Sequence, residues 1–225
     1  MRALLNLRYT VPERRAAFEK GLNRIGDPEV FVTWNRIGTA DQVARQYEAR
    51  GQPVIVAENA AWGNEFAGRQ WYSLALGMHN TAGRFPIGET ERFDRLDVDL
   101  APWRTGGERV VLPQRGIGPV GVAMPRDWPA TQRGRVRSHP GTRACIPLEQ
   151  DLAQAGEVVT WGSGAAIKAL MWGIRVESHM PNWIGEQNST DAGRLSMFRR
   201  LAWAQWTLQE IESGEPFERL IRCTC

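Results

Sequence analysis

Short apolar runs alternate with amphipathic stretches along the first part of the chain. Residues 3–7, 30–34 and 54–57 are rich in aliphatic and aromatic side chains and read as buried strands. Residues 12–25 and 39–51 repeat apolar positions at helical spacing. The first of these stretches opens with a proline, and the second has a capping threonine at its start and a glycine at its end. Three strands alternating with two helices predict an α/β layer.

The most regular pattern is EVVTWGSGAAIKALMWGIRVESH, which begins at Glu157. Its first residues, 157–161, are β-branched or aromatic and predict a short buried strand. Glycines break the extended pattern at 162–164, and the helix that follows ends at Gly173. Extended structure resumes at 174–176. The order strand, helix, strand predicts a βαβ unit with parallel strands.

The rest of the chain carries weaker patterns. Strands are predicted at residues 74–78, 109–112 and 136–138, and a helix in the stretch LEQDLAQA that follows Pro147. Apolar residues then repeat at helical spacing over 190–213, which predicts one long closing helix.

Two lobes follow from these patterns. The glycine pair at 106–107 is a plausible linker, so the chain divides into residues 1–105 and 106–225. The predicted fold class is α/β, with two small Rossmann-like lobes whose mostly parallel sheets face a cleft. The long irregular segment 62–104, rich in aromatic residues, is typical of a functional loop region.

Composition changes this picture only slightly. Ten tryptophans and 42% hydrophobic residues among 225 are ample for packed cores, and no apolar run reaches the ~20 residues that span a bilayer. The three cysteines lack the paired spacing of a zinc site, which favours a reducing compartment and a cytoplasmic protein, in the host cytoplasm if the chain is viral. Only two of the 28 basic residues are lysines. This bias suits phosphate and nucleic acid, and it equally fits GC-rich coding.

The turn at residues 162–164 is the first candidate for chemistry. In parallel α/β sheets, ligands lie beyond the carboxyl ends of the strands. The free N–H groups and the dipole of a helix N-terminus favour an anion there, and Ser163 adds a hydroxyl between two glycines. This pattern favours phosphate binding, with simple packing of small residues as the alternative.

Three strand ends of the second half carry similar polar turns: Gln114-Arg115-Gly116, His139-Pro140-Gly141 and Gly162-Ser163-Gly164. Their order, with the LEQDLAQA helix before VVTWGSGAAIKALMWGIRV, resembles the nucleotide-binding half of GT-B glycosyltransferases. The likeness is greatest to capsule-polysaccharide (Kdo-transferase-like) enzymes and related phage-type, DNA-modifying glycosyltransferases, and it covers about residues 108–213.

The resemblance implies a nucleotide-sugar donor in the second lobe, with a UDP-sugar as first candidate, a CMP-sugar as the other, and no metal. Ser163 and Gly164 would bind the donor phosphates, and His139 would contact a phosphate or the departing oxyanion. For His139 alone, a hydrogen bond to a neighbouring loop is the plainer reading. The donor-binding residues that the resemblance implies are Gln114, Arg115, Gly116, His139, Gly141, Arg143, Trp161, Gly162, Ser163, Gly164 and Lys168.

Transfer to a hydroxyl needs a base near that oxygen. Glu58 and His79 follow predicted strands of the first lobe and are candidate bases, Glu58 being preferred because it ends a buried strand. Glu58 equally fits a carboxylate that caps the next turn. The catalytic candidates are thus Glu58, His79 and His139. The acceptor-binding candidates are Trp34, Asn35, Arg36, Asn59, Asn80, Arg133, Arg135 and Arg137.

Arg133, Arg135 and Arg137 belong to a basic stretch, residues 126–143, that contains a single acidic residue. Such a stretch could follow a phosphate backbone. The expected acceptor is therefore double-stranded DNA carrying a 5-hydroxymethylpyrimidine, and the alternative is a saccharide. Two other classes compete. One is a non-catalytic nucleotide or nucleic-acid binding module. The other is a serine hydrolase built on Ser163, His179 and Asp191, in which Trp161 and Ala165 occupy the places where a nucleophile elbow has glycine.

Overall fold

The computed structural model describes residues 3–7, 12–79, 82–118, 120–139, 146–180, 184 and 187–223. The protein is α/β, with one mixed and one parallel sheet. Its chain forms two compact units, the first from residues 1–96 and 199–225 and the second from 97–198. Each unit contains one of the two sheets.

The first unit is built on a sheet of strand order β1-β2-β3-β5-β10, in which β4 also pairs with β5. Strands β1, β2 and β3 are parallel, as the sequence predicts, whereas β5 and β10 each run antiparallel to their neighbour. The strands are β1 Leu4–Asn6, β2 Phe31–Trp34, β3 Val54–Asn59, β4 Glu65–Phe66, β5 Arg69–Leu76 and β10 Gln205–Thr207.

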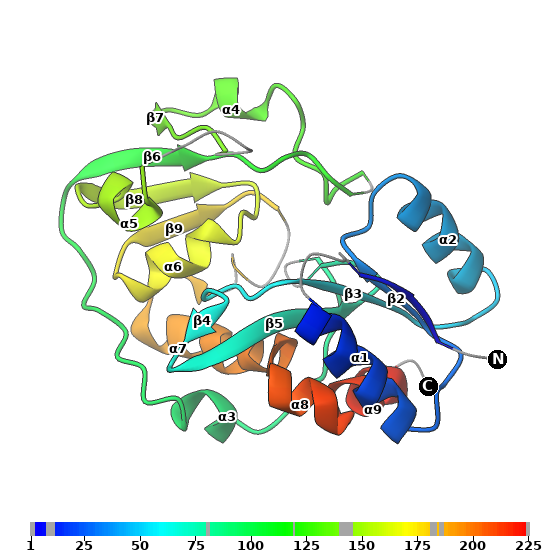
Figure 1. The fold of residues 1–225 in the computed structure, drawn as a ribbon. Helices are drawn as coiled ribbons and strands as arrows, with labels where there is room; N and C mark the ends of the chain where they lie inside the picture. The colour runs from blue at the N-terminus through cyan, green and yellow to red at the C-terminus, as the bar shows by residue number, and fades with distance from the viewer. Residues whose placement is uncertain are drawn as a thin grey trace. The chain divides into compact units, whose positions relative to one another are not determined.

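Helices cover both faces of this sheet because alternate side chains of each strand point to opposite sides. Figure 1 shows α1, α8 and α9 together on one face and α2 apart from them. Val32, Ile55 and Leu74 belong to the larger core, while Phe31 and Val56 pack with α2 in a smaller one. The helices of this unit are α1 Pro12–Arg24, α2 Thr39–Glu48, α3 Glu91–Asp94, α8 Leu208–Ser213 and α9 Glu215–Arg222.

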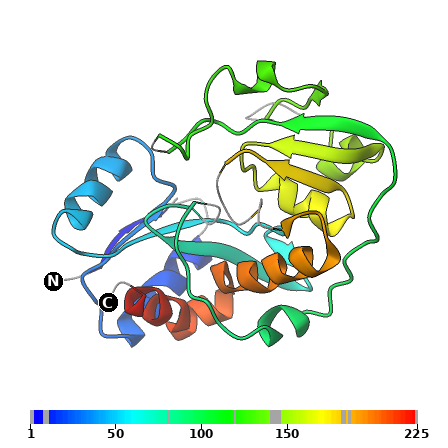
Figure 2. The ribbon, with the colours of Figure 1, turned by 180° about the vertical axis from the view of Figure 1, so that it is seen from behind.

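The second unit is built on a parallel sheet of order β7-β6-β8-β9. The predicted βαβ unit is confirmed, because β8, α6 and β9 follow one another and β8 pairs with β9 in parallel. Figure 2, seen from behind, shows β6, β8 and β9 side by side. The elements of this unit are β6 Glu108–Leu112, α4 Trp128–Thr131, β7 Arg135–Val136, α5 Leu148–Asp151, β8 Ala155–Thr160, α6 Ala165–Met171 and β9 Arg175–Ser178.

The predicted long closing helix is wrong. Helix α7 covers only Asp191–Leu201, and a 3₁₀ turn then leads into strand β10. Trp206 of β10 is fully buried in the core of the first unit, so the tail belongs to that unit and not to the second lobe. A sequence signal marks the restart of the helix. Thr207 and Glu210 form a capping box, in which each side chain accepts a hydrogen bond from the other's backbone N–H.

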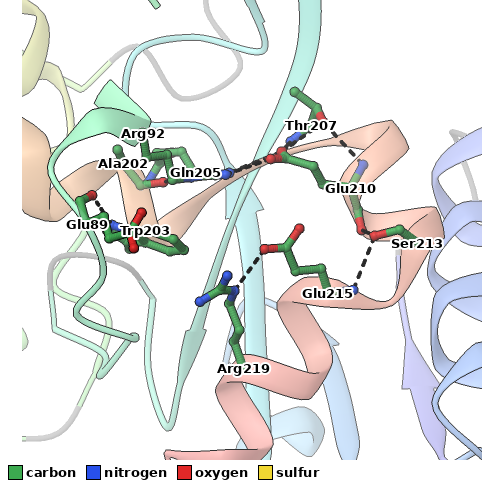
Figure 3. Close-up of polar contacts among 10 residues, drawn as sticks. All are labelled: Glu89, Arg92, Ala202, Trp203, Gln205, Thr207, Glu210, Ser213, Glu215 and Arg219. Atoms are coloured by element: carbon green, nitrogen blue, oxygen red, sulfur yellow. Dashed lines mark hydrogen bonds and ion pairs between the residues drawn. The ribbon is translucent and has the colours of Figure 1, made fainter. Parts of the chain in front are cut away.

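Arg92 ties the segment that carries α3 to this tail (Figure 3). Its guanidinium donates to the carbonyl oxygens of Ala202 (2.8 Å) and Gln205 (2.7 Å) and to the carboxylate of Glu210 (2.6 Å). The same group lies over the rings of Trp203 and Trp206. Backbone, charge and ring contacts thus all converge on one arginine whose side chain is 14% exposed.

Helices α1 and α8 approach closely at Gly21, which lies inside α1. A Cβ added there would lie 2.0 Å from the carbonyl oxygen of Ile211 and 2.8 Å from a ring carbon of Phe217. We expect Gly21→Ala to lower the free energy of unfolding by about 2 kcal/mol, because the helices must move apart in a packed core. Urea denaturation measures this. Asn23→Ala on the exposed side of α1 is the control, and equal stability of the two variants would contradict the close approach.

Candidate functional site

The carboxyl ends of all four strands of the second sheet meet at one edge, because the strands are parallel. Gln114 and Arg115 follow β6, His139 follows β7, and Trp161 follows β8. The structure therefore brings the described residues that follow these three strands, Gln114 and Arg115, His139, and Trp161, to the same edge. His179 follows β9 and lies at the same edge, although the sequence pattern indicates a role for it only in a serine hydrolase.

A basic cluster occupies this edge at the ends of β6 and β7. The partial burial of His139, together with the charges of Arg115 and Arg137, lowers the pKa of its imidazole below the ordinary 6.5. The ring is therefore neutral at pH 7, and two guanidinium groups lie close enough to act on it. Arg115 is exposed, so the cluster presents positive charge to solvent. Such a cluster attracts an anion.

The turn after β8 uses most of its own hydrogen-bond donors. The hydroxyl of Thr160 donates to the carbonyl oxygen of Leu112 (2.9 Å) and accepts from the backbone N–H groups of Gly162 (3.1 Å) and Ser163 (2.8 Å). The Ser163 hydroxyl in turn accepts from the N–H of Ala165 (3.3 Å). The turn is thus held rigidly by its own side chains, and fewer N–H groups face outward than the sequence pattern implies.

Gly164 differs from its neighbour Gly162. Gly162 has a φ of 126°, and a Cβ on it would meet Met180, so the backbone and the packing both require glycine. Gly164 has an ordinary helical φ of −57°, and nothing lies within 4 Å of the Cβ that could be added. Neither backbone strain nor packing within the described residues explains the glycine at 164. Because Gly164 has no side chain, a ligand can approach the backbone there without obstruction.

Of the remaining predicted donor residues, the structure describes Trp161, Gly116 and Lys168. Trp161 donates from its indole N–H to the carbonyl oxygen of Val122 (3.1 Å), and its ring packs edge-to-face on Trp128. Gly116 has a φ of 65° in the loop after β6. Lys168 lies in the first turns of α6 and is partly exposed. Gly141 and Arg143 lie outside the described residues, so the structure places neither.

His179 is held by hydrogen bonds at both ring nitrogens. The indole N–H of Trp128 donates to Nδ1 (3.1 Å), which leaves the proton of the neutral ring on Nε2, where the carboxylate of Glu177 accepts it (2.8 Å). Glu177 also accepts from Arg109 (2.6 Å), which is the first cause of its lowered pKa, and the bond from His179 lowers it further. Because both nitrogens of His179 are occupied, the ring does not serve Ser163 as a base.

Of the three arginines predicted to bind the acceptor, Arg133, Arg135 and Arg137, two form ion pairs within the protein. Arg135 donates to the carboxylates of Glu108 (2.6 Å) and Asp151 (3.0 Å). Arg137 forms an ion pair with Asp151 (2.5 Å). Arg133 is exposed. Two of the three arginines predicted to follow a phosphate backbone therefore already have carboxylate partners inside the protein.

In the first unit, polar side chains meet where β2 and β3 end. With its amide oriented to satisfy both neighbours, Asn35 donates to Glu58 (2.8 Å) and accepts from the indole N–H of Trp34 (3.2 Å). Asn35 has a φ of 66°, a left-handed conformation that asparagine tolerates better than most residues. The Thr33 hydroxyl donates to the Asn35 carbonyl oxygen (3.0 Å) and supports this turn. Glu58 is thus part of a hydrogen-bonded chain that orients Trp34.

Other candidates of the first unit do not join this group. His79 follows β5, and because β5 is antiparallel to β3 it lies at the edge where β3 begins, opposite Glu58. The two candidate bases therefore lie at opposite edges of the first sheet. Burial lowers the pKa of His79, so its ring is neutral at pH 7. Arg36 is held by Asp41 (2.7 Å) and Glu48 (2.6 Å), which leaves its side chain 10% exposed.

Asn59 accepts a hydrogen bond from Asn64 (3.1 Å), and Asn80 lies outside the described residues. Within the part of the chain that the structure describes, no three His, Cys, Asp or Glu side chains are grouped as metal ligands, and no helix is long and apolar enough to cross a membrane. Compared with models of known protein families the chain matches none, and no curated protein matches it either.

Proposed function

We propose that the protein is a glycosyltransferase that moves a sugar from a nucleotide-sugar donor to a hydroxyl acceptor. In this proposal the second unit binds the donor, the first unit contributes the acceptor side, and the two correspond to the lobes of a GT-B enzyme. The observation that carries the proposal is the edge of the second sheet. There a basic cluster and an unobstructed glycine follow neighbouring parallel strands, in the sheet order β7-β6-β8.

The chemistry of this edge suits a diphosphate. The exposed Arg115 supplies positive charge beside His139, whose neutral ring at pH 7 can hydrogen-bond a phosphate oxygen or accept a proton. Gly164 allows a phosphate to approach the backbone closely. As the glycosidic bond to the donor breaks, negative charge grows on the departing phosphate, and Arg115 stabilises it.

The acceptor is proposed as a saccharide rather than DNA. A phosphate backbone would have to compete with Glu108 and Asp151 for Arg135 and Arg137, which are already paired. That competition removes the main support for a DNA acceptor. Because Arg137 is paired in the same way at the donor edge, the donor proposal rests on the exposed Arg115 as its cation. Glu58 remains the candidate base for the acceptor hydroxyl, and the chain of hydrogen bonds through Asn35 would fix its position.

A panel of UDP-, GDP- and CMP-sugars tests the proposal. We expect one of them to raise the melting temperature of the protein, because a ligand that binds only the folded state stabilises it. We also expect donor turnover to persist in EDTA, since cationic side chains are proposed to stabilise the leaving group. The stabilisation should be weaker in Arg115→Met, and Arg133→Met is the matched control in the same unit. Absence of binding by all three donor classes would reject the proposal. Loss of turnover in EDTA that magnesium or manganese restores would reject the leaving-group account.

A further inference from the structure

Arg14, in the first turn of the 13-residue helix α1, is buried in the first unit. Only 7% of its surface is exposed. Arginine is almost never buried to this degree without an ionic partner. Among the described residues, however, Arg14 has neither an ion pair nor a hydrogen-bond acceptor for its side chain, and its Nε atom is fully buried.

Two aromatic rings hold the guanidinium in place. Its Cζ atom lies 3.9 Å from the ring centroid of Trp34 and 4.9 Å from that of Tyr72. The two rings are nearly perpendicular to each other, with centroids 6.0 Å apart, so Arg14 lies in the corner between them. Stacking of this kind engages the faces of the guanidinium. The N–H donors project from its edge and have no acceptor among the described residues.

The position of this corner matches the place where ligands bind in parallel α/β sheets. Trp34 is the last residue of β2, and Tyr72 pairs with Asn59, the last residue of β3. Arg14 therefore lies at the carboxyl edge of β2 and β3, beside the N-terminus of α1, whose dipole favours negative charge at the same place. A buried cation, a helix N-terminus and the strand ends are three independent features that favour one kind of ligand.

The corner is also built rigidly. Trp34 is oriented by its hydrogen bond to Asn35, and Asn35 by Glu58. This chain of contacts fixes the ring on which Arg14 lies. It also binds one carboxylate oxygen of Glu58.

We propose that Arg14 is the anchor of an oxyanion-binding site in the first unit, and that the ligand of this unit carries a carboxylate or a phosphate group. Such a group accepts two parallel hydrogen bonds from a guanidinium edge and neutralises its charge. The inference depends only on the first unit. If the proposed transfer reaction is correct, this ligand is the acceptor, which is then an acidic saccharide or a sugar phosphate.

Nuclear magnetic resonance of the arginine Nε–H groups tests this site directly. The signal of Arg14 is identified as the one absent from Arg14→Lys, which keeps the charge, and the signal of Arg15 as the one absent from Arg15→Lys. Wild-type protein is then titrated with sodium phosphate, with sodium acetate and with sodium chloride. We expect phosphate or acetate to shift the Arg14 signal saturably, whereas chloride leaves it in place. The anion that acts shows whether the ligand group is a phosphate or a carboxylate.

The affinity of the active anion should fall roughly tenfold or more in Arg14→Met, which keeps much of the side-chain volume but has no charge. Arg15→Met on the same helix should bind as wild type does. If neither phosphate nor acetate shifts the Arg14 signal, or if chloride shifts it equally, the stack serves packing alone and the inference is rejected. No sugar donor enters this experiment, so its failure is separate from failure of the proposed function.

Discussion

Arg92→Met is expected to lower the free energy of unfolding by about 3 kcal/mol, because it breaks a largely buried ion pair and leaves its partners unsatisfied. The substitution keeps an unbranched side chain against Trp203 and Trp206, so it removes polar contacts more than volume. It leaves the carboxylate of Glu210 and two carbonyl oxygens of the tail without this donor. Chemical denaturation at pH 7 measures the loss.

The pH dependence of this effect has a definite sign. Burial raises the pKa of Glu210, but Arg92 and the hydrogen bonds of Thr207 outweigh it and hold that pKa below its ordinary 4.5. The carboxylate therefore contributes stability that is present above pH 4.5 and is lost as the pH falls through the lowered pKa. In Arg92→Met the hydrogen bond and the charge of Arg92 are absent, so the pKa of Glu210 rises relative to that in the wild type. The stability difference between the two proteins should narrow as the pH falls below 4.5.

Two further variants control this experiment. Arg95→Met changes an exposed arginine just after the same short helix and should cost no more than about 0.5 kcal/mol. Arg92→Lys keeps the charge but cannot reach the carboxylate and both carbonyl oxygens together, so its stability should be intermediate. If Arg92→Met lowers the free energy of unfolding by no more than Arg95→Met does, the tail is held by its apolar contacts alone.

Gly164→Val is expected to weaken donor binding by more than about 3 kcal/mol, or roughly a hundredfold, if the second unit binds a nucleotide-sugar as proposed. The physical reason is steric, since the added side chain would fill the space through which a phosphate approaches the backbone. Titration calorimetry with the donor that stabilises the wild type measures the change. Folding should be unaffected, because the backbone at Gly164 is helical and its Cβ position is open.

Ser163→Ala provides the graded comparison. It removes one hydroxyl and should cost about 1–3 kcal/mol of donor affinity, the scale of one hydrogen bond to a charged group. It also removes the acceptor for the N–H of Ala165, so its stability should be measured beside its affinity. Normal donor binding in a folded Gly164→Val protein would remove this turn from the site, even if Ser163→Ala binds more weakly.

Local patterns predict the elements well where a stretch of chain carries its own start and stop signals. The strand–helix–strand unit after Glu157 is one such case, since β-branched residues define the strand and Gly173, with a φ of 73°, ends the helix. The first three strands and two helices are another. The closing helix was mispredicted because apolar residues continue at helical spacing through a strand, although the capping box at Thr207 marks a new helix.

The features of the candidate site likewise divide into those visible in the local sequence and those that depend on residues far apart in the chain. The polar residues that follow β6, β7 and β8 are recognisable in the sequence because they come after apolar runs, and parallel strands carry Arg115, His139 and Trp161 to one edge. The carboxylate partners of Arg135 and Arg137, in contrast, come from distant positions. The aromatic partners of Arg14 also come from distant positions. In the sequence Arg14 resembles an ordinary helix-surface residue, and only the fold places Trp34 and Tyr72 against it.

The amino-acid sequence by itself determined the α/β class, the first three strands and two helices, and the strand–helix–strand unit that begins at β8. These depend on neighbouring residues, through side-chain periodicity, caps and glycine conformations. Only the tertiary structure decided the direction of β5, the return of the tail to the first sheet as β10, and which charges are paired. These depend on contacts between residues far apart in the chain, and burial of Trp206 in the first core outweighs the helical tendency of its local sequence.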